Sequence, residues 1–91
     1  MMIELNCGVT VDVKKDVFDD MRIVDFLADI EDGNFLSIAR LTSAIFSKED
    51  KKKIYDKLGE AYNGRVPVVE FQNLITELMS KLGEQGKNLS I

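Results

Sequence analysis

Apolar side chains recur at helical spacing along residues 67–82, which makes this segment the clearest helix in the chain. The stripe consists of Phe71, Leu74, Ile75, Leu78, Met79 and Leu82. Pro67 suits the first helical position, and Gly83 can adopt the left-handed backbone that ends a helix. Burying six such side chains would contribute roughly 10 kcal/mol at most, but only against a partner surface. We therefore expect the rest of the chain to supply that surface.

The first residues of the chain alternate between apolar and polar, as short β-strands do. The apolar positions are Ile3, Leu5, Val9, Val11 and Val13. Asn6-Cys7-Gly8 interrupts them with residues typical of a tight turn. This pattern predicts a β-hairpin. An isolated hairpin is only marginally stable in water, so its apolar face should lie on the helices.

Residues 16–30 form a second amphipathic segment. Asp16 can cap this helix, which places Asp19 and Asp20 in the first turn, where the helix dipole favours negative charge. Glu31-Asp32-Gly33-Asn34 is typical of a helix end, and Asn34 can cap the next helix. The apolar stripe of this segment is broad: Val17, Phe18, Met21, Ile23, Val24, Phe26, Leu27, Ala28 and Ile30.

Two further helices are expected between residues 35 and 62. Residues 35–46 are apolar on nearly every side, with Arg40 as the only charge, so this helix should be the most buried. Ser47, followed three residues later by Asp50, resembles a capping box and starts the next helix. That helix ends at Asn63-Gly64. Lysines occupy one side of it, and its other side carries Ile54, Tyr55, Leu58, Ala61 and Tyr62.

Together these patterns predict a mainly α (α+β) fold, an N-terminal β-hairpin followed by a compact bundle of about four helices. The single domain spans residues 1–83, because a chain of 91 residues that is 45% hydrophobic has material for one core. Residues 84–91 are expected to form a flexible C-terminal tail. No apolar run approaches the roughly 20 residues needed to cross a bilayer, and no basic segment precedes an apolar one at the N-terminus. We therefore expect a cytoplasmic protein, which its single cysteine, Cys7, also fits.

Charge is unevenly distributed along the chain. The net charge of −4 argues against binding to nucleic acid, which requires clustered Lys and Arg. Residues 16–32 contain seven acidic residues against Arg22 alone, whereas residues 48–57 contain five lysines. These segments are either two solvated helix faces or complementary surfaces, within the protein or in a weak homo-oligomer.

The residue inventory excludes several kinds of chemistry. The chain has no histidine and one cysteine, so zinc sites with nitrogen and sulfur ligands and histidine-based triads are excluded. Residues 29–34 fail as a calcium loop, because placing Gly33 sixth puts Ala28, Ile30 and Ala39 at ligand positions. No Asp-Ser pair offers the attachment point of an acyl carrier. We therefore expect no enzymatic activity, no cofactor and no metal.

Binding through a surface is the activity that remains. The apolar residues of segments 17–30 and 35–46 exceed what a small bundle easily covers, so part of them can form a partner-binding patch. The alternative is that each of them simply fills the core. The candidate partner-binding residues are Phe18, Phe26 and Phe35, together with the acidic Asp19, Asp20 and Asp25.

Three stretches give the chain a characteristic order of parts: Asp19-Asp20-Met21-Arg22, Gly64-Arg65-Val66-Pro67-Val68, and the end from Leu82-Gly83 to Gly86-Lys87-Asn88-Leu89-Ser90. In this order the chain resembles the small tail assembly chaperones of long-tailed bacteriophages and prophages. The resemblance implies a non-enzymatic, non-virion protein of the bacterial cytoplasm. Such a protein binds the tape measure protein, keeps its long apolar helix soluble and helps recruit tail tube subunits.

The same resemblance implies a programmed frameshift that produces a longer form. Gly86-Lys87-Asn88 can be encoded as GGA-AAA-AAC, which contains a slippery run, although an ordinary polar tail is an equally simple interpretation. Two other functional classes stay open. The chain could be a small regulatory adaptor of the antitoxin or anti-repressor type, or it could be a structural subunit of the tail.

Overall fold

The N-terminal residues form the antiparallel hairpin that their alternation predicts. The computed structural model describes residues 1–86, in which β1 (Met2–Glu4) pairs with β2 (Thr10–Asp12). Gly8 closes the turn with a φ of +99°, a conformation that glycine adopts without strain. One face of the hairpin is buried, and it consists of the five predicted residues Ile3, Leu5, Val9, Val11 and Val13.

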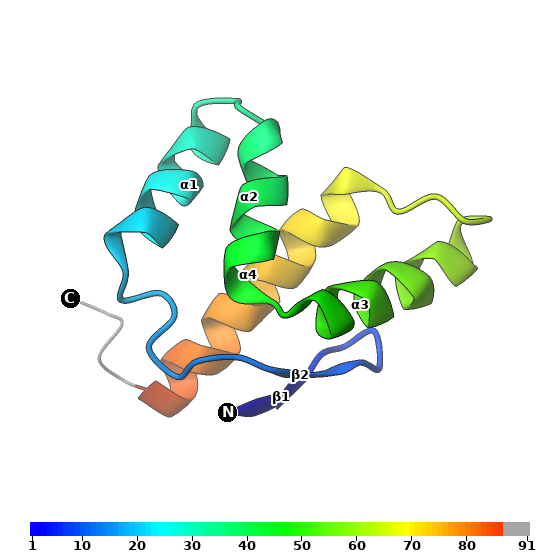
Figure 1. The fold of residues 1–91 in the computed structure, drawn as a ribbon, viewed down its shortest axis with the longest axis horizontal. Helices are drawn as coiled ribbons and strands as arrows, with labels where there is room; N and C mark the ends of the chain where they lie inside the picture. Colours follow the sequence, from blue (N-terminus) through cyan, green and yellow to red (C-terminus); the bar gives the residue numbers. More distant parts are fainter. Residues whose placement is uncertain (87–91) are drawn as a thin grey trace.

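Four helices follow the hairpin in the described part of the chain, so the α+β fold is confirmed. α1 (Met21–Glu31) and α2 (Leu36–Ile45) run antiparallel and pack side by side (Figure 1). α3 (Lys48–Ala61) contacts both α2 and β2, and α4 (Val68–Gly86) runs diagonally behind α2. None of these helices is long and apolar enough to cross a membrane.

α1 begins five residues later than the predicted cap at Asp16. The capping residue is Asp20, whose side chain accepts a hydrogen bond of 2.9 Å from the amide of Arg22. Asp16 instead belongs to a turn in which its carbonyl accepts from the amide of Asp19. This turn directs Val17 into the core, where the side chain is buried. The prediction placed Asp19 and Asp20 inside the first helical turn, but both precede it.

The buried face of α1 is narrower than the predicted stripe. Ile23 is buried, and Phe26, Leu27 and Ile30 pack partly against the core at the spacing of one helical face. The predicted stripe was wrong at Met21, Val24 and Ala28, because all three residues are exposed.

α2 has the largest share of buried residues among the helices, as predicted, but it is not buried on every side. Its buried residues are Ser37, Ile38, Leu41, Thr42 and Ile45. Leu36 and Ala39 are exposed on the remaining sides. The expected cap at Asn34 is also absent, because Phe35 takes the capping position without a side-chain hydrogen bond.

α3 starts and stops where its sequence predicts. The Ser47 hydroxyl accepts a hydrogen bond of 3.1 Å from the amide of Asp50, which is half of the expected capping box. Beyond the helix, Asn63 and Gly64 both have positive φ and end it. The predicted apolar side is buried only in part: Ile54 and Leu58 are buried, whereas Tyr55, Ala61 and Tyr62 are exposed.

α4 buries five of the six residues that predicted it, the exception being Met79, which is exposed. Pro67 precedes the helix, and its carbonyl accepts from the amides of Glu70 and Phe71. Gly83 was expected to end the helix, but the helical backbone continues to Gly86. The predicted tail of residues 84–91 therefore begins as helix, and residues 87–91 lie outside the described part of the structure.

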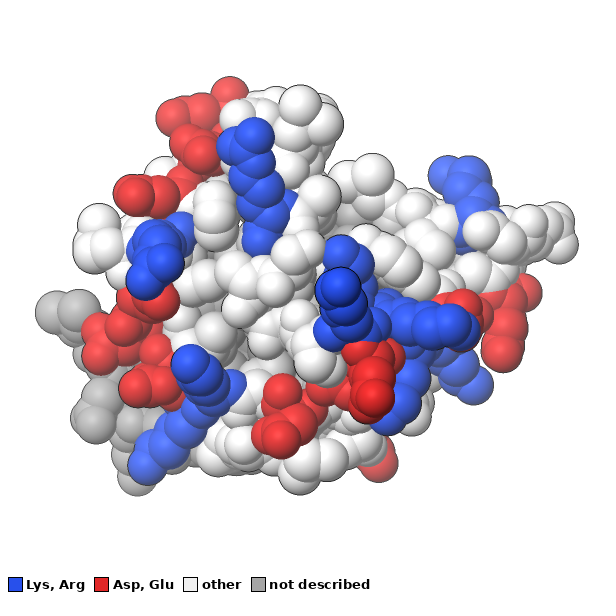
Figure 2. Space-filling view, viewed as in Figure 1, with Lys and Arg blue, Asp and Glu red and all other residues white. Residues whose placement is uncertain are grey.

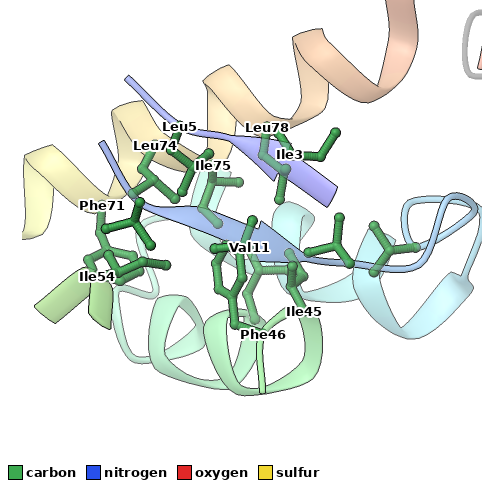
Figure 3. Close-up of a cluster of buried hydrophobic side chains, with 14 of the residues drawn as sticks. Ile3, Leu5, Val11, Ile45, Phe46, Ile54, Phe71, Leu74, Ile75 and Leu78 are labelled. Carbon is green, nitrogen blue, oxygen red and sulfur yellow. The ribbon is translucent and has the colours of Figure 1, made fainter. Parts of the chain in front are cut away.

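The core joins the hairpin to the helices. Figure 3 shows Ile3 and Val11 of the two strands in one cluster with Ile54 of α3 and with Leu74 and Leu78 of α4. The helix stripe at residues 67–82 therefore finds the partner surface that its hydrophobic pattern requires.

Candidate protein-binding surface

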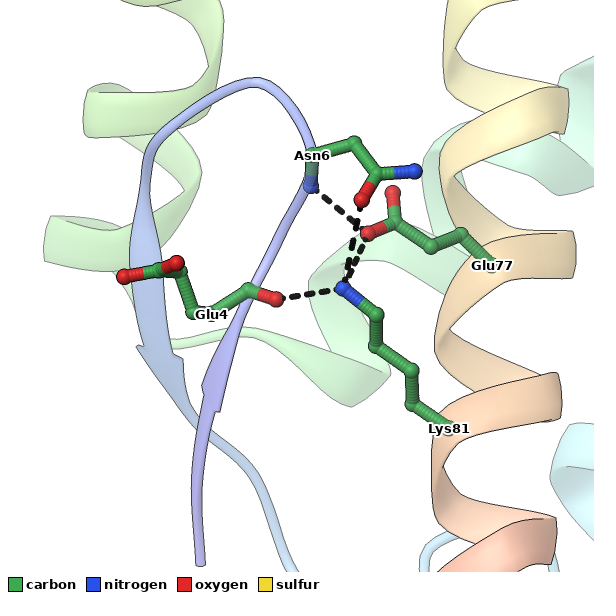
Figure 4. A network of polar contacts seen from close by, with 4 residues as sticks. All are labelled: Glu4, Asn6, Glu77 and Lys81. Atoms are coloured by element: carbon green, nitrogen blue, oxygen red, sulfur yellow. Dashed lines mark hydrogen bonds and ion pairs between the residues drawn. The ribbon is translucent and has the colours of Figure 1, made fainter.

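Polar side chains of α4 converge on the outer edge of β1, as Figure 4 shows. One carboxylate oxygen of Glu77 accepts from the Asn6 amide and from the Lys81 ammonium, each at 2.6 Å. Lys81 also donates to the carbonyl of Glu4 at 2.6 Å. These hydrogen bonds attach the hairpin to α4.

An apolar hollow of about 460 Å³ lies between α2, the second half of α3 and the start of α4, and we call it the α2–α4 groove. Its lining consists of Phe35, Ile38, Ala39, Thr42, Tyr55, Asp56, Gly64, Val66, Pro67, Val68 and Phe71. Most of these side chains are apolar, and Asp56 is the only charged one. Such a groove suits an apolar segment of another protein.

Aromatic and aliphatic side chains form the walls of the α2–α4 groove. Phe35 is 62% exposed at the start of α2, and Val68 is 54% exposed at the start of α4. Tyr55 packs edge-on against the buried Phe71, with ring centroids 5.2 Å apart. The groove therefore combines the exposed ring of Phe35 with the ring of Tyr55, which packs against a residue of the core.

The connection between α3 and α4, which forms one end of the groove, is held by a hydrogen bond. The Tyr62 hydroxyl donates to a carboxylate oxygen of Glu70 at 3.0 Å. This hydrogen bond and the negative charge of Glu70 raise the pKa of Tyr62 above its ordinary value. The contact joins the end of α3 to the first turn of α4.

A second hollow, of about 290 Å³, lies between α1, α2 and α4 and shares Ile38 with the α2–α4 groove. Leu27, Ile30 and Met79 give it an apolar lining, and Glu31 is its only charged residue. The two hollows together leave apolar surface along both sides of α2.

A third hollow, of about 570 Å³, lies between α1, α2 and the turn that precedes α1. It brings together three of the predicted partner-binding residues: Asp19, Asp20 and Phe26. Arg22 and Arg40 line it as well, so both signs of charge face the same space. This mixture does not select a cation or an anion.

The structure therefore divides the predicted partner-binding residues between separate places. Phe35 lines the α2–α4 groove, on a different surface from Asp19, Asp20 and Phe26. Phe18 packs partly against the core, and Asp25 is exposed on α1 and lines none of the three hollows.

The sequence did not identify Val68 and Tyr55 as candidates. The signal for Val68 was the pair of adjacent valines, Val68 and Val69, at a helix start, where one helical face cannot bury both. Of the residues proposed for a frameshift, Gly86 is the last residue of α4, and Lys87 and Asn88 lie outside the described residues.

Residues 1–86 contain no group of three or more side chains suited to hold a metal ion. Comparisons of the chain with protein-family models, with curated proteins and with solved structures give no match. The exposed apolar surface is the feature of the described residues that bears on binding.

Proposed function

We propose that this chain is a tail assembly chaperone of a long-tailed bacteriophage or prophage. In this role it binds the tape measure protein in the bacterial cytoplasm, keeps that protein's long apolar helix soluble and helps recruit tail tube subunits. The role is not catalytic, and the chaperone is absent from the finished virion. The order of parts in which the sequence resembles this family supports the proposal.

The observation that carries the proposal is the apolar lining of the α2–α4 groove. A soluble domain this small leaves Phe35 and Val68 exposed beside a hollow of about 460 Å³. Exposed apolar surface around a groove is typical of proteins that receive an amphipathic helix. A chaperone for a long helix needs such a surface, whereas a protein without partners gains nothing from it.

Co-expression with the tape measure protein encoded in the same gene cluster tests the proposal. We expect this chain to move the tape measure protein from the insoluble to the soluble fraction and to co-purify with it. The variant Phe35→Asp should lose this effect, because it places a charge on the apolar wall. Met21→Asp is the matched control, since Met21 is also exposed, at 69%, but lies outside the groove.

Other outcomes would point to a different function. A tape measure protein that stays insoluble beside the folded chain contradicts the chaperone role. A stable one-to-one complex with a small globular protein encoded next to the gene would favour the adaptor class. Finding the chain in purified virions would favour a structural tail subunit.

The nucleotide sequence of the gene tests the proposed longer form separately. A slippery run at the codons for Gly86, Lys87 and Asn88, followed by an overlapping open frame, is the expected result. If the slippery run is interrupted and no overlapping open frame follows, the proposed frameshift is wrong. The binding proposal is then judged by the co-expression experiment alone.

A further inference from the structure

We propose that α1 is a lid that detaches as a unit from α2 and α4 while the hairpin, α2, α3 and α4 stay folded. Its opening uncovers apolar side chains of α2 and α4 that continue the α2–α4 groove. The lid is a property of the chain by itself and does not depend on which partner the chain binds.

α1 has the smallest buried face of the described helices. Ile23 is its only buried residue, whereas α2 buries five residues in a shorter helix. Phe26, Leu27 and Ile30 are only partly buried. Elements with few buried apolar contacts open at a lower free energy than the core does. The burial pattern therefore makes α1 the first helix to detach.

α1 is attached mainly to one neighbour. Among the helices and strands it packs chiefly on α2, and Figure 1 shows it at the edge of the molecule. The Ser37 hydroxyl of α2 donates a hydrogen bond of 3.2 Å to the Asp29 carboxylate of α1. Within residues 1–86 no other side-chain hydrogen bond and no ion pair joins α1 to another helix or to the hairpin. Opening therefore breaks one polar side-chain contact.

Hollows border both halves of α1. The hollow of about 290 Å³ is lined by Leu27 and Ile30 in the C-terminal half of the helix. The hollow of about 570 Å³ is lined by Ile23 and Phe26 in the N-terminal half. Side chains that border a void lose the dispersion contacts that close packing provides. α1 is therefore loosely held along its length.

The segments at the two ends of α1 are suited to act as hinges. Gly33 follows the helix with a φ of +94°, and no atom beyond the adjacent residues lies within 4 Å of where a Cβ would stand. A glycine with free space around it can change its backbone angles without a clash. Before the helix, the buried Val17 anchors the preceding turn, so the movement begins at residues 18–20. α1 can therefore swing without moving α2 or the hairpin.

The surface beneath the lid is apolar and adjoins the α2–α4 groove. Ile38 lines both the groove and the hollow next to α1, and Leu41 and Ile75 line that hollow as well. In the closed molecule Ile38, Leu41 and Ile75 are buried, with 8%, 0% and 6% of their surfaces exposed. Detaching α1 extends the apolar surface of the groove along α2. The lid therefore controls how much of this surface a partner can reach.

Native-state hydrogen exchange of the full-length chain tests the lid, with urea added below the unfolding transition. We expect the amides of residues 25–31 to share one opening free energy and one dependence on urea. They should exchange at least about tenfold faster than the slowest amides of α2 and α4. Exchange of α1 only through global unfolding contradicts the lid. So do protection that rises gradually from the helix ends, as in fraying, and opening that includes α2.

Two substitutions separate the lid from the rest of the fold. Leu27→Ala should accelerate exchange in α1 by about tenfold, because it removes contacts that only the closed lid makes. Ile54→Val is the matched control, since Ile54 is a fully buried residue of α3 that lines neither hollow beside α1. It should accelerate the slowest amides and leave those of α1 unchanged. Acceleration of α1 by both substitutions would mean that α1 opens only when the whole chain unfolds.

Thiol labelling tests whether the opening uncovers the surface beneath α1. In a chain with Cys7→Ser, Leu41→Cys places a thiol in the hollow next to α1, and Leu78→Cys places one away from both hollows. Both positions are 0% exposed. We expect the Leu41→Cys variant to react faster than its own global unfolding allows, and the Leu78→Cys variant to react only through global unfolding. Circular dichroism and urea unfolding establish that both variants fold.

Two labelling results would overturn the lid. If the Leu41→Cys variant reacts no faster than it unfolds, α1 does not uncover α2. If the Leu78→Cys variant also reacts faster than it unfolds, the opening is not confined to α1.

Discussion

Asp50 is a buried charged residue in the first turn of α3, with 7% of its surface exposed. Its amide donates to the Ser47 hydroxyl, but its carboxylate does not complete the capping box. One carboxylate oxygen instead accepts from the amide of Asp12 at 2.9 Å, and the other lies 3.9 Å from the Lys53 ammonium. A residue that a local pattern assigns to a helix cap thus also attaches β2 to α3.

Removing this carboxylate should destabilise the protein. Asp50→Ala leaves the partly buried amide of Asp12 without its acceptor, which should lower the free energy of unfolding by about 1–3 kcal/mol. Urea unfolding followed by circular dichroism measures the change. Glu49→Ala is the matched control, because Glu49 is an exposed acid in the same helical turn. An equal loss in both variants would mean that only the interaction with the helix dipole matters.

At the scale of elements, the hairpin depends on the helices to close its outer edge. The carbonyl of Glu4 and the amide of Asn6 have no neighbouring strand, and Lys81 and Glu77 of α4 supply their hydrogen-bonding partners. Open strand edges favour pairing with other chains, and side chains that occupy the edge prevent this. The contacts join residues more than 70 positions apart in the sequence.

The Glu77–Lys81 pair should therefore stabilise the fold more than an ordinary helix pair does. A double-mutant cycle with Glu77→Gln and Lys81→Met should give a coupling free energy of about 1 kcal/mol, because the pair is partly shielded from water. The two side chains are 16% and 32% exposed. Denaturant unfolding of the four proteins measures the coupling.

The Lys52–Asp56 pair provides the comparison, since it has the same i,i+4 spacing but is well exposed at both ends. Its coupling should lie at about 0.3–0.5 kcal/mol. Equal couplings for the two pairs would show that Glu77 and Lys81 contribute nothing beyond their contact along the helix. Hydrogen exchange at the Asn6 amide should also be faster in the Glu77→Gln variant.

Over the whole molecule, charge is unevenly distributed between two of the helices: α1 has three acidic residues against Arg22, whereas α3 has five lysines beside four acidic residues. Figure 2 shows Lys and Arg gathered over α3, and acidic side chains along α1 and the turn after it. Within residues 1–86 no ion pair joins these two helices, so they do not form complementary surfaces inside one molecule. Lysines of α3 instead pair within their own helix, with Asp50, Asp56 and Glu60.

We predict that this uneven distribution of charge drives weak self-association at low salt. Light scattering should give a mean mass above that of the monomer at low ionic strength and the monomer mass at high ionic strength. The Debye length falls from about 30 Å at 0.01 M salt to about 3 Å at 1 M, which screens contacts between exposed charges. Phe35→Ser should not change this behaviour, whereas Asp25→Asn should weaken it. A mass that is independent of salt contradicts the prediction.

The sequence by itself determined the elements whose patterns are local and regular. The alternation of apolar and polar residues around Asn6-Cys7-Gly8 determined the hairpin, because alternate residues of a strand lie on one face. The helical spacing of apolar residues determined the buried face of α4, because residues three and four apart lie on one face of a helix. The start of α3 at Ser47 was also predictable, since one side chain satisfies an amide only three residues away.

The tertiary structure decided the features that depend on distant residues. Asp20 rather than Asp16 caps α1, because the preceding turn directs Val17 into a core built from other elements. The α2–α4 groove was only partly predictable. Phe35 is unusual as an exposed aromatic, but Tyr55 and Val68 gain their role only where three helices converge. Periodicity specifies which face of a helix is apolar, and only packing determines how much of that face other elements cover.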